Sequence, residues 1–393
     1  MQEVVNEQPY RFVHPDPGRI WWSLLEQALP WYLNHYWGVE RVELRGTEHL
    51  RGSLAAGHGI LLAANHPRPC DPIVLGQLSR ELRQPFFTMA SWHLFMNGGW
   101  QAWAMHKLGG FSVFREGVDR AAITAAIDIL VSGQRPLLIF PEGAVSRTND
   151  RVNPLLEGTA FIARTAAKRR EKAGQGRVIV HPIAIRYRFH GDVRSAVEPV
   201  LNDIESRLTW RPVPERQLVE RIAKVGEALL TLKELEYLGR PQTGTLDERL
   251  RRLIDHLLVP LERQWLTGDD ETNTVVRVKR LRSAIMPTLT AGELSEVDKQ
   301  HRWRQLADCY LAQQLSWYPP DYLRDDPTPE RILETVERFE EDVTDEARTH
   351  RPLGALVEVG EAISIPAQRE RSASGDDLSE LIESRLRTMI APG

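Results

Sequence analysis

A histidine and an aspartate stand out among the residues whose types and spacing could do chemistry. The segment Asn65-His66-Pro67-Arg68-Pro69-Cys70-Asp71 directly follows the apolar run 60–64. A second segment, Phe140-Pro141-Glu142-Gly143, ends the apolar run 137–140 in a turn. An imidazole beside a carboxylate can act as a general base, because the carboxylate fixes the tautomer of the ring and supports the imidazolium. Such a pair deprotonates a weak nucleophile, typically a hydroxyl, so acyl transfer to an alcohol is a leading possibility.

Each of these residues also has a simpler interpretation. Asp71 followed by Pro72 is a common helix start, so the carboxylate could serve as an N-cap. Pro141-Glu142-Gly143 could be a plain turn. Cys70 beside the pair would suit a Cys–His hydrolase, but the segment supplies no separate base for it. Metal-ligand spacing is not found among His58, His93, His106 and His181, so we expect no metal site.

Composition narrows the class of protein. The chain has 393 residues, 42% hydrophobic and 26% charged, with a formal net charge of −4. A general nucleic-acid binder would show a basic excess, so we expect no nucleic-acid partner. The only cysteines are Cys70 and Cys309, which form no disulfide framework and suit a reducing cytoplasm.

The N-terminal region is polar at first and then rich in aromatic residues. Residues 1–18 are predicted to be a loose arm with no signal peptide, because no apolar core follows a basic start. No apolar run approaches the roughly 20 residues that span a bilayer, so any membrane contact is expected to be peripheral. Tryptophans and tyrosines crowd residues 21–37, and more aromatic residues crowd 92–103. These rings either pack against the protein body or dock on a membrane interface.

Periodicity predicts the fold class. Strands are expected at 60–64, 86–89, 137–140 and 178–185, and helices at 20–37 (kinked near Pro30), 72–82, 120–131 and 158–170. Continuous apolar strands separated by helices indicate a mixed, mostly parallel sheet covered on both faces, an α/β architecture.

A helical block follows, and the chain then returns to the strand pattern. Thr245 with Glu248, and Thr328 with Pro329, are typical of helix starts. Residues 356–365 again read as a strand, which must pair with something, and a last amphipathic helix follows it. We therefore expect four parts: an arm and aromatic helix (1–45), a first α/β part (46–194), a helical insertion without an evident internal repeat (195–352), and a closing strand and helix (353–393).

Four motifs in order resemble the glycerolipid acyltransferase family, whose best-known members acylate lysophosphatidate. The first is Asn-His with an Asp after four intervening residues, at Asn65, His66 and Asp71. The others are Gly109-Gly-Phe-Ser-Val-Phe-Arg115, Phe140-Pro-Glu-Gly143 and the proline-bearing strand 180–184. The resemblance covers roughly residues 40–190 and 353–393 and leaves the helical block uncovered.

The resemblance implies roles for individual residues. It makes His66 the general base and Asp71 its orienting partner, with Asn65 among the substrate-binding residues. It makes Arg115 a ligand for the acceptor's phosphate, and Glu142 and Gly143 residues that shape the acceptor site. It requires no metal and no bound cofactor, only acyl-CoA or acyl-carrier protein as co-substrate.

Two departures from the family pattern concern the acceptor. The third motif usually continues Thr-Arg-Ser, but here Ala144 and Val145 follow, and Arg147 is the candidate substitute for the missing arginine. A basic residue usual before Gly158 is also absent. A less anionic acceptor or a remodelled phosphate site is therefore plausible.

These observations predict an acyltransferase that moves a fatty acyl group onto a hydroxyl of a lysophospholipid such as 1-acyl-glycerol-3-phosphate. The predicted location is the cytoplasm, peripheral at the inner face of the membrane. The alternatives are a lipid-binding or scaffold protein that kept the fold, and a thioester hydrolase that uses the same base.

Overall fold

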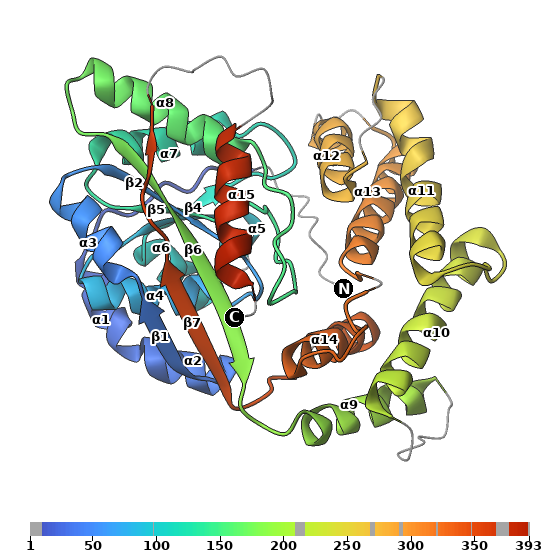
Figure 1. Ribbon diagram of the computed structural model, residues 1–393. Coiled ribbons are helices and arrows are strands. Elements are labelled where there is room, and N and C mark those ends of the chain that lie inside the picture. Colours follow the sequence, from blue (N-terminus) through green and yellow to red (C-terminus); the bar gives the residue numbers. More distant parts are fainter. Residues whose placement is uncertain are drawn as a thin grey trace. The chain divides into compact units, whose positions relative to one another are not determined.

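The chain forms two compact units in the computed structural model, which describes residues 10–96, 98–208, 217–267, 272–290, 294–319, 321–346, 348–366 and 377–391 (Figure 1). The sheet unit is drawn from Tyr10–Val113, Asp119–Gly191 and Thr349–Gly393. The helical unit is drawn from Asp192–Arg348 together with the short segment Phe114–Val118. The sheet unit is thus completed by a segment that follows the long helical stretch in sequence.

Among the described residues, eight strands form one mixed sheet in the order β1-β7-β6-β2-β5-β3-β4, with β8 also paired to β6. The neighbours along this order are parallel except that β6 runs antiparallel to β7 and β8. This confirms the predicted mixed, mostly parallel α/β sheet. The strands are β1 (Val39–Arg45), β2 (Gly59–Ala64), β3 (Phe87–Ser91), β4 (Gly110–Val113), β5 (Leu137–Ile139), β6 (Val178–Phe189), β7 (Leu353–Val359) and β8 (Ile363–Ile365).

Helices cover both faces of the sheet, which explains the continuous apolar strands. In β2 every residue is buried, yet only Leu61 and Ala63 belong to the core cluster shared with α7, α8 and α15. Their neighbours Ile60 and Leu62 point to the opposite face, since side chains alternate along a strand. The helices of this unit are α1 (Ile20–Leu25), α2 (Leu29–Trp37), α3 (Thr47–Ala55), α4 (Asp71–Leu82), α5 (His93–Met96), α6 (Gly99–Lys107), α7 (Arg120–Ser132), α8 (Gly158–Lys172) and α15 (Asp377–Ile390).

The closing segment returns to the sheet, as its alternating pattern predicted. It is split in two: β7 lies between β1 and β6, whereas β8 pairs with the first residues of β6. Strand β1 has no counterpart among the predicted strands. Its sequence carries four charged residues on a largely exposed edge, so it lacks the apolar run by which the other strands were recognised.

The described part of the N-terminal arm is docked and not loose, which corrects the prediction. Val13 exchanges hydrogen bonds with Ser112, and the Tyr10 hydroxyl donates to Asp119. Lys107 forms an ion pair with Asp16 at 2.6 Å. The sequence hid this because the arm is polar and gains order only from contacts with residues about 100 positions away. Residues 1–9 of the predicted arm lie outside the described residues.

The predicted kink in the helix 20–37 is confirmed, but it begins before the proline. A 3₁₀ turn, Glu26–Ala28, separates α1 from α2, and Pro30 is the second residue of α2. At that position a proline is well accommodated, because the first amide groups of a helix have no partner inside the helix.

The helical unit consists of helices in the described residues: α9 (Val193–Arg207), α10 (Leu218–Leu238), α11 (Leu246–Trp265), α12 (Thr274–Thr290), α13 (Glu296–Ser316) and α14 (Pro329–Thr344). Both predicted helix starts are confirmed: Thr245 and Glu248 form a capping box, and Thr328 caps α14. Apolar side chains of α11, α12 and α13 form its main core.

A recurring ion pair, buried in two of its three instances, links the first four of these helices. The fourth residue of α10, α11 and α12 is Arg221, Arg249 and Arg277, with 28 residues from one arginine to the next. Each uses Nε and Nη2 to bind both oxygens of a glutamate near the end of the preceding helix, at distances from 2.7 to 3.1 Å. The glutamates are Glu205, Glu234 and Glu262. Only these charged residues recur at this spacing and the apolar pattern does not, so the expectation of no internal repeat stays a prediction.

Candidate active site

His66 and Asp71 form a buried hydrogen-bonded pair at the carboxyl end of β2. The distance from His66 Nδ1 to Asp71 Oδ2 is 2.7 Å. His66 retains 8% of its surface and Asp71 none. Strand β2 delivers the histidine, and α4 begins with the aspartate, so one loop of four residues brings the two together.

The carboxylate of Asp71 is fully occupied by donors, and this defines the imidazole tautomer. Oδ2 also accepts the backbone N–H of Arg68 at 2.9 Å, and Oδ1 accepts the hydroxyl of Tyr187 at 2.5 Å. An ionised Asp side chain only accepts hydrogen bonds, so in that form Nδ1 of His66 donates the third bond. The lone pair then lies on Nε2, the nitrogen that can take a proton. Nε2 has no hydrogen-bond partner among the described residues.

Asp71 does not cap α4, contrary to the simpler interpretation of the Asp-Pro pair. Cys70 occupies the N-cap position, and it makes no side-chain capping hydrogen bond. Asp71 is the first helical residue and directs its carboxylate away from the helix amides, toward His66 and Tyr187. Its position at a helix N-terminus still favours the negative charge through the helix dipole.

The Phe140–Gly143 segment and the loop after it hold His66 through three contacts. The Phe140 ring stacks on the imidazole with centroids 4.0 Å apart. Glu142 Oε1 accepts the backbone N–H of His66 at 2.9 Å. The backbone N–H of Ser146, in the loop that follows, donates to the His66 carbonyl at 2.7 Å. The third sequence motif thus fixes both the ring and the main chain of the first.

Glu142 is a buried carboxyl without a cationic partner among the described residues. Its second oxygen accepts the N–H of Asn153 at 2.9 Å, and 1% of its surface is exposed. Burial raises the pKa of Glu142 to about 7, against the effect of the two amide hydrogen bonds, and nearby Asp71 raises it further. A predicted contact of Glu142 with the acceptor stays a prediction, because both oxygens are engaged within the protein.

Two asparagines fix the strand that carries Tyr187. The pairing of β2 with β6 ends at Ile183. Beyond that point the backbone of β6 forms hydrogen bonds with the side-chain amides of two asparagines instead. Asn65 donates to the Ile185 carbonyl at 2.9 Å and accepts its N–H at 2.7 Å. Asn149 donates to the Tyr187 carbonyl at 2.9 Å and accepts its N–H at 2.5 Å. Asn65 is fully buried, so its geometry favours support of the strand; its predicted contact with substrate stays a prediction.

Cys70 is a neutral thiol in this arrangement. Its Sγ lies 3.3 Å from Tyr187 Oη, and only 1% of the residue is exposed. Burial raises the pKa of the Cys70 thiol to about 12, and the neighbouring Asp71 charge adds to the effect. A thiolate nucleophile is therefore disfavoured at this position.

The remaining predicted residues fall in two places. Gly143 has a φ of 73°, and a Cβ there would lie 2.4 Å from a Leu156 methyl, so the turn requires glycine. Arg147 has a φ of 56° and follows Ser146, which binds the His66 main chain. Arg115 lies two residues beyond β4, exposed, in the segment that belongs to the helical unit; its neighbour Glu116 forms an ion pair with Arg282 of α12. The predicted phosphate-binding roles of Arg115 and Arg147 stay predictions.

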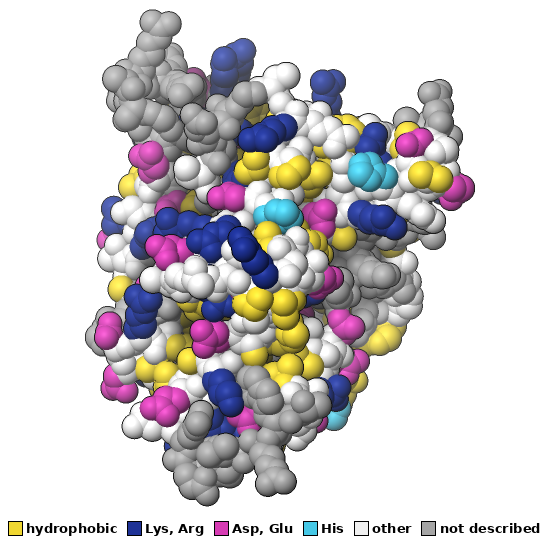
Figure 2. Space-filling view, turned by 90° about the vertical axis from the view of Figure 1, so that its right-hand side faces the viewer, with side chains coloured by type: hydrophobic (Ala, Val, Ile, Leu, Met, Phe, Trp, Pro, Cys, Tyr) yellow, Lys and Arg dark blue, Asp and Glu magenta, His cyan; other side chains and the backbone are white. Residues whose placement is uncertain are grey.

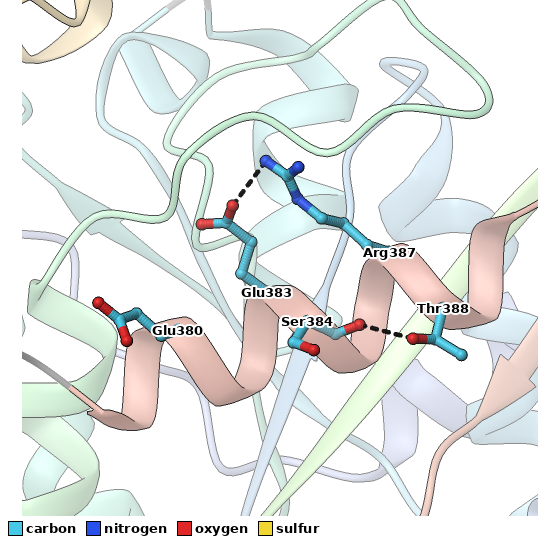
Figure 3. A pocket seen from close by; sticks show the side chains of 5 residues that line it. All are labelled: Glu380, Glu383, Ser384, Arg387 and Thr388. Carbon is cyan, nitrogen blue, oxygen red and sulfur yellow. Dashed lines mark hydrogen bonds and ion pairs between the residues drawn. The ribbon is translucent and has the colours of Figure 1, made fainter.

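Other parts of the described surface offer no comparable arrangement. No group of three or more potential metal ligands is found among the described residues. A shallow depression on α15 is lined by side chains of that one helix, including the Glu383–Arg387 ion pair at 2.7 Å (Figure 3). On the face drawn in Figure 2, cationic and anionic side chains are interspersed and do not form a field of one sign.

Sequence reasoning missed Tyr187, Asn149, Phe140 as a ring partner, and Ser146. Tyr187 lies two residues beyond the predicted end of strand 178–185, in a stretch that alternates Arg-Tyr-Arg-Phe and so reads as a plain edge. The one available signal was the position of Asn149 shortly after the third motif. Such contacts span 38 to 116 residues and leave no local pattern.

A family model matches the part of the chain that carries most of this site. Residues 41–186 match the family model described as Acyltransferase, which spans β1 to β6 and includes every residue of the His66–Asp71–Tyr187 neighbourhood except Tyr187 itself. A comparison with curated proteins finds no match to the chain.

Proposed function

Because residues 41–186 match the family model described as Acyltransferase, we propose that this protein transfers a fatty acyl group from a thioester to the hydroxyl of a lysophospholipid. The donor would be acyl-CoA or acyl-carrier protein, and the acceptor a lipid such as 1-acyl-glycerol-3-phosphate. The observation that carries the proposal is the His66–Asp71 pair, in which Nδ1 is engaged by the carboxylate and Nε2 is left as the proton acceptor.

In the proposed reaction Nε2 of His66 takes the proton from the acceptor hydroxyl as its oxygen attacks the thioester carbonyl carbon. A C–O bond forms, and the carbonyl electrons move onto oxygen to give a tetrahedral oxyanion. The oxyanion then collapses, the C–S bond breaks, and the imidazolium returns its proton to the leaving thiolate. Asp71 supports the positive charge on the ring during these steps.

The acceptor end of the site departs from the family pattern, since Ala144 and Val145 replace the polar residues usual at that point of the third motif. Arg147 supports a cationic contact near His66, because the adjacent residue Ser146 binds the His66 carbonyl. An arginine fork suits phosphate oxygens. We therefore propose Arg147 as the first arginine to examine for the acceptor's phosphate, with Arg115 as the second.

Exposed tryptophans support a peripheral contact with the membrane. Trp31 and Trp100 are 61% and 57% exposed, and Trp21 and Trp103 are 44% and 40% exposed. Trp21 meets Trp103 edge-on at 4.8 Å, so aromatic side chains of α1 and α6 adjoin although they are far apart in sequence. No helix among the described residues is long and apolar enough to cross a membrane. We propose that this aromatic surface rests on the lipid interface at the cytoplasmic side.

The test of the activity is the release of free thiol from acyl-CoA and from acyl-carrier protein, each measured with and without lysophosphatidate. Release that requires the acceptor and is lost in His66→Ala is the expected result. Release that ignores the acceptor would identify a thioester hydrolase. Release from neither donor, with lysophosphatidate or with a neutral lysolipid, would support a scaffold that has lost the chemistry.

The test of the membrane contact is co-sedimentation with vesicles of anionic phospholipid. Trp31→Glu and Trp100→Glu should each weaken binding, because each places a charge in the aromatic surface. Phe161→Glu on α8 is the matched control, since Phe161 is also exposed, at 55%, but lies on another helix. Equal binding by all three variants would contradict the proposed docking surface.

A further inference from the structure

We propose that Tyr187 is a positioning residue for the base: its hydroxyl holds Asp71 Oδ1, so that Oδ2 stays aligned with Nδ1 of His66. The inference rests on the proposed function, because it concerns the same histidine. It adds a residue that lies outside the four sequence motifs. The hydroxyl-to-carboxylate distance is 2.5 Å, and both side chains are essentially buried.

The need for such a residue follows from the geometry of the carboxylate. A carboxylate held through one oxygen can turn about its bond to Cβ, and the Nδ1 bond then loses its direction. In this site Oδ2 accepts from His66 and from the Arg68 amide, whereas Oδ1 accepts from Tyr187. The Tyr187 hydroxyl makes the only hydrogen bond to Oδ1 among the described residues. Removing it frees the rotation that Asp71 has to resist.

Tyr187 is itself held in place more firmly than a core tyrosine needs to be. Its main-chain N–H and C=O both bind the side chain of Asn149, and Ile185, two residues earlier, is bound in the same way by Asn65. On its other edge β6 pairs with β7, where Tyr187 faces Ala355. The strand is thus fixed on both sides at the point where the phenol reaches Asp71.

The direction of the hydrogen bonds is also fixed. Burial raises the pKa of Tyr187 well above its ordinary value, and the Asp71 charge adds to this, so the phenol stays a donor. Its oxygen can then accept the thiol proton of Cys70, whose sulfur is 3.3 Å away. The Tyr187 hydroxyl, the Arg68 amide and His66 Nδ1 therefore all donate to the single carboxylate of Asp71.

A purely structural hydrogen bond is the competing explanation, and Tyr10 provides the matched control. The Tyr10 hydroxyl also donates to a carboxylate at 2.5 Å, that of Asp119, in the same unit but with no contact to His66. Tyr10→Phe and Tyr187→Phe each remove one phenol–carboxylate bond and keep the ring. Only Tyr187→Phe should alter the imidazole.

The experiment measures the reactivity of His66 directly, so it does not depend on acyl transfer. Full-length protein is treated briefly with diethyl pyrocarbonate, which acylates the free imidazole nitrogen, and modification of the His66 peptide is followed by mass spectrometry. The proteins compared are wild type, Tyr187→Phe, Tyr10→Phe, Asp71→Asn and the Asp71→Asn/Tyr187→Phe double variant. The acyl-transfer rate and the melting temperature are recorded for each.

We expect the rate of His66 modification in Tyr187→Phe to fall about tenfold, the scale of one hydrogen bond to a charged group. Tyr10→Phe should keep the wild-type rate. In the double variant the loss of the phenol should add nothing to Asp71→Asn, because the two residues act as one unit. If Tyr187→Phe reacts like Tyr10→Phe, or if its effect is additive with Asp71→Asn, the positioning role is wrong.

Two further comparisons keep the inference separate from folding and from the proposed function. If Tyr187→Phe fails to fold, Asn149→Ala decides: it keeps the phenol and loosens only its backbone, so a smaller loss of His66 reactivity supports the role and an unchanged rate overturns it. If wild type transfers no acyl group at all, the proposed function fails. The reactivity comparison still decides whether Tyr187 positions the base.

Discussion

The sheet unit and the helical unit both bury carboxylates, but they treat the charge differently. In the helical unit Glu205, Glu234 and Glu262 each lie against an arginine that binds both oxygens. In the sheet unit Asp71 is held by an imidazole, an amide and a phenol, and Glu142 by two amides. In the first arrangement the arginine neutralises the negative charge of the glutamate. In the second, no arginine or lysine of the described residues neutralises the charge of the carboxylate.

The pKa directions of two glutamates express this difference. Burial raises the pKa of Glu142 to about 7. Burial also acts on Glu234, but the hydrogen bonds from Arg249 outweigh it and lower the pKa of that carboxyl. A paired carboxylate fastens one helix to the next, while an unpaired one responds to protons near neutrality. The comparison teaches that a buried carboxylate indicates a candidate active site only where no arginine or lysine neutralises its charge.

The largest expected effect is on the sheet unit's chemistry. His66→Ala should lower the rate of acyl transfer by about 10² to 10⁴, the usual contribution of a general base. Its unfolding free energy should fall by only about 1 kcal/mol, the scale of one hydrogen bond. Thiol release and chemical denaturation measure the two quantities. His49→Ala, at a partly exposed position on α3, is the control. Normal turnover by His66→Ala would contradict the assignment of the chemistry to the His66–Asp71 pair of the sheet unit.

The next effect is on the stability of the helical unit. Arg249→Met should cost about 3 to 5 kcal/mol, because it leaves Glu234 buried without its partner. Replacing both residues by methionine should recover most of the loss. Arg251→Met, which breaks an exposed ion pair with Asp247, should cost less than about 1 kcal/mol. The measurement is denaturant unfolding followed by circular dichroism; equal losses for Arg249→Met and Arg251→Met would contradict a structural role for the buried pairs.

A pH dependence should distinguish Glu142 from the paired glutamates. Its pKa is raised in the folded state above the unfolded value of 4.5, so the folded protein binds the extra proton between about pH 4.5 and 7. The stability that this proton confers is complete below pH 4.5 and is lost as the pH rises through 7, with a slope of at most about 1.4 kcal/mol per pH unit. Glu142→Gln should lack that slope, measured as unfolding free energy against pH, whereas exposed Glu40→Gln should keep it. A wild-type slope in Glu142→Gln would assign the effect to another group.

The smallest expected effect is on a helix start in the helical unit. Thr245→Ala removes the capping box of α11 and should cost about 1 kcal/mol. Because the cap carries no buried charge, its loss should be the same at pH 5 and pH 8. Thermal unfolding at both pH values measures it, and a strong pH dependence would show that charge in this unit is less well compensated than the paired arginines indicate.

Much of the fold was predictable from local patterns. The apolar runs located β2, β3, β5 and β6, and the cap residues located the starts of α11 and α14. β1 was not predictable, since its charged residues hide an edge strand. The docking of residues 10–18 was not predictable either, because a polar arm is ordered only by partners distant in sequence. The 28-residue spacing of arginines was visible in the sequence but has no meaning until each glutamate partner is known.

The sequence by itself determined which residues could do chemistry, because His66, Asp71 and the Phe140–Gly143 turn lie in short segments next to apolar strands. It also determined the α/β class, since strand and helix periods are local properties. Only the tertiary structure decided what holds the base: Tyr187 reaches Asp71 across 116 residues, and Glu142 reaches the His66 amide across 76. It likewise decided that Asn65 supports β6 and that Arg115 belongs to the helical unit. The physical reason is that a hydrogen-bond partner is chosen by distance in space, and the folding of distant segments onto one sheet sets that distance.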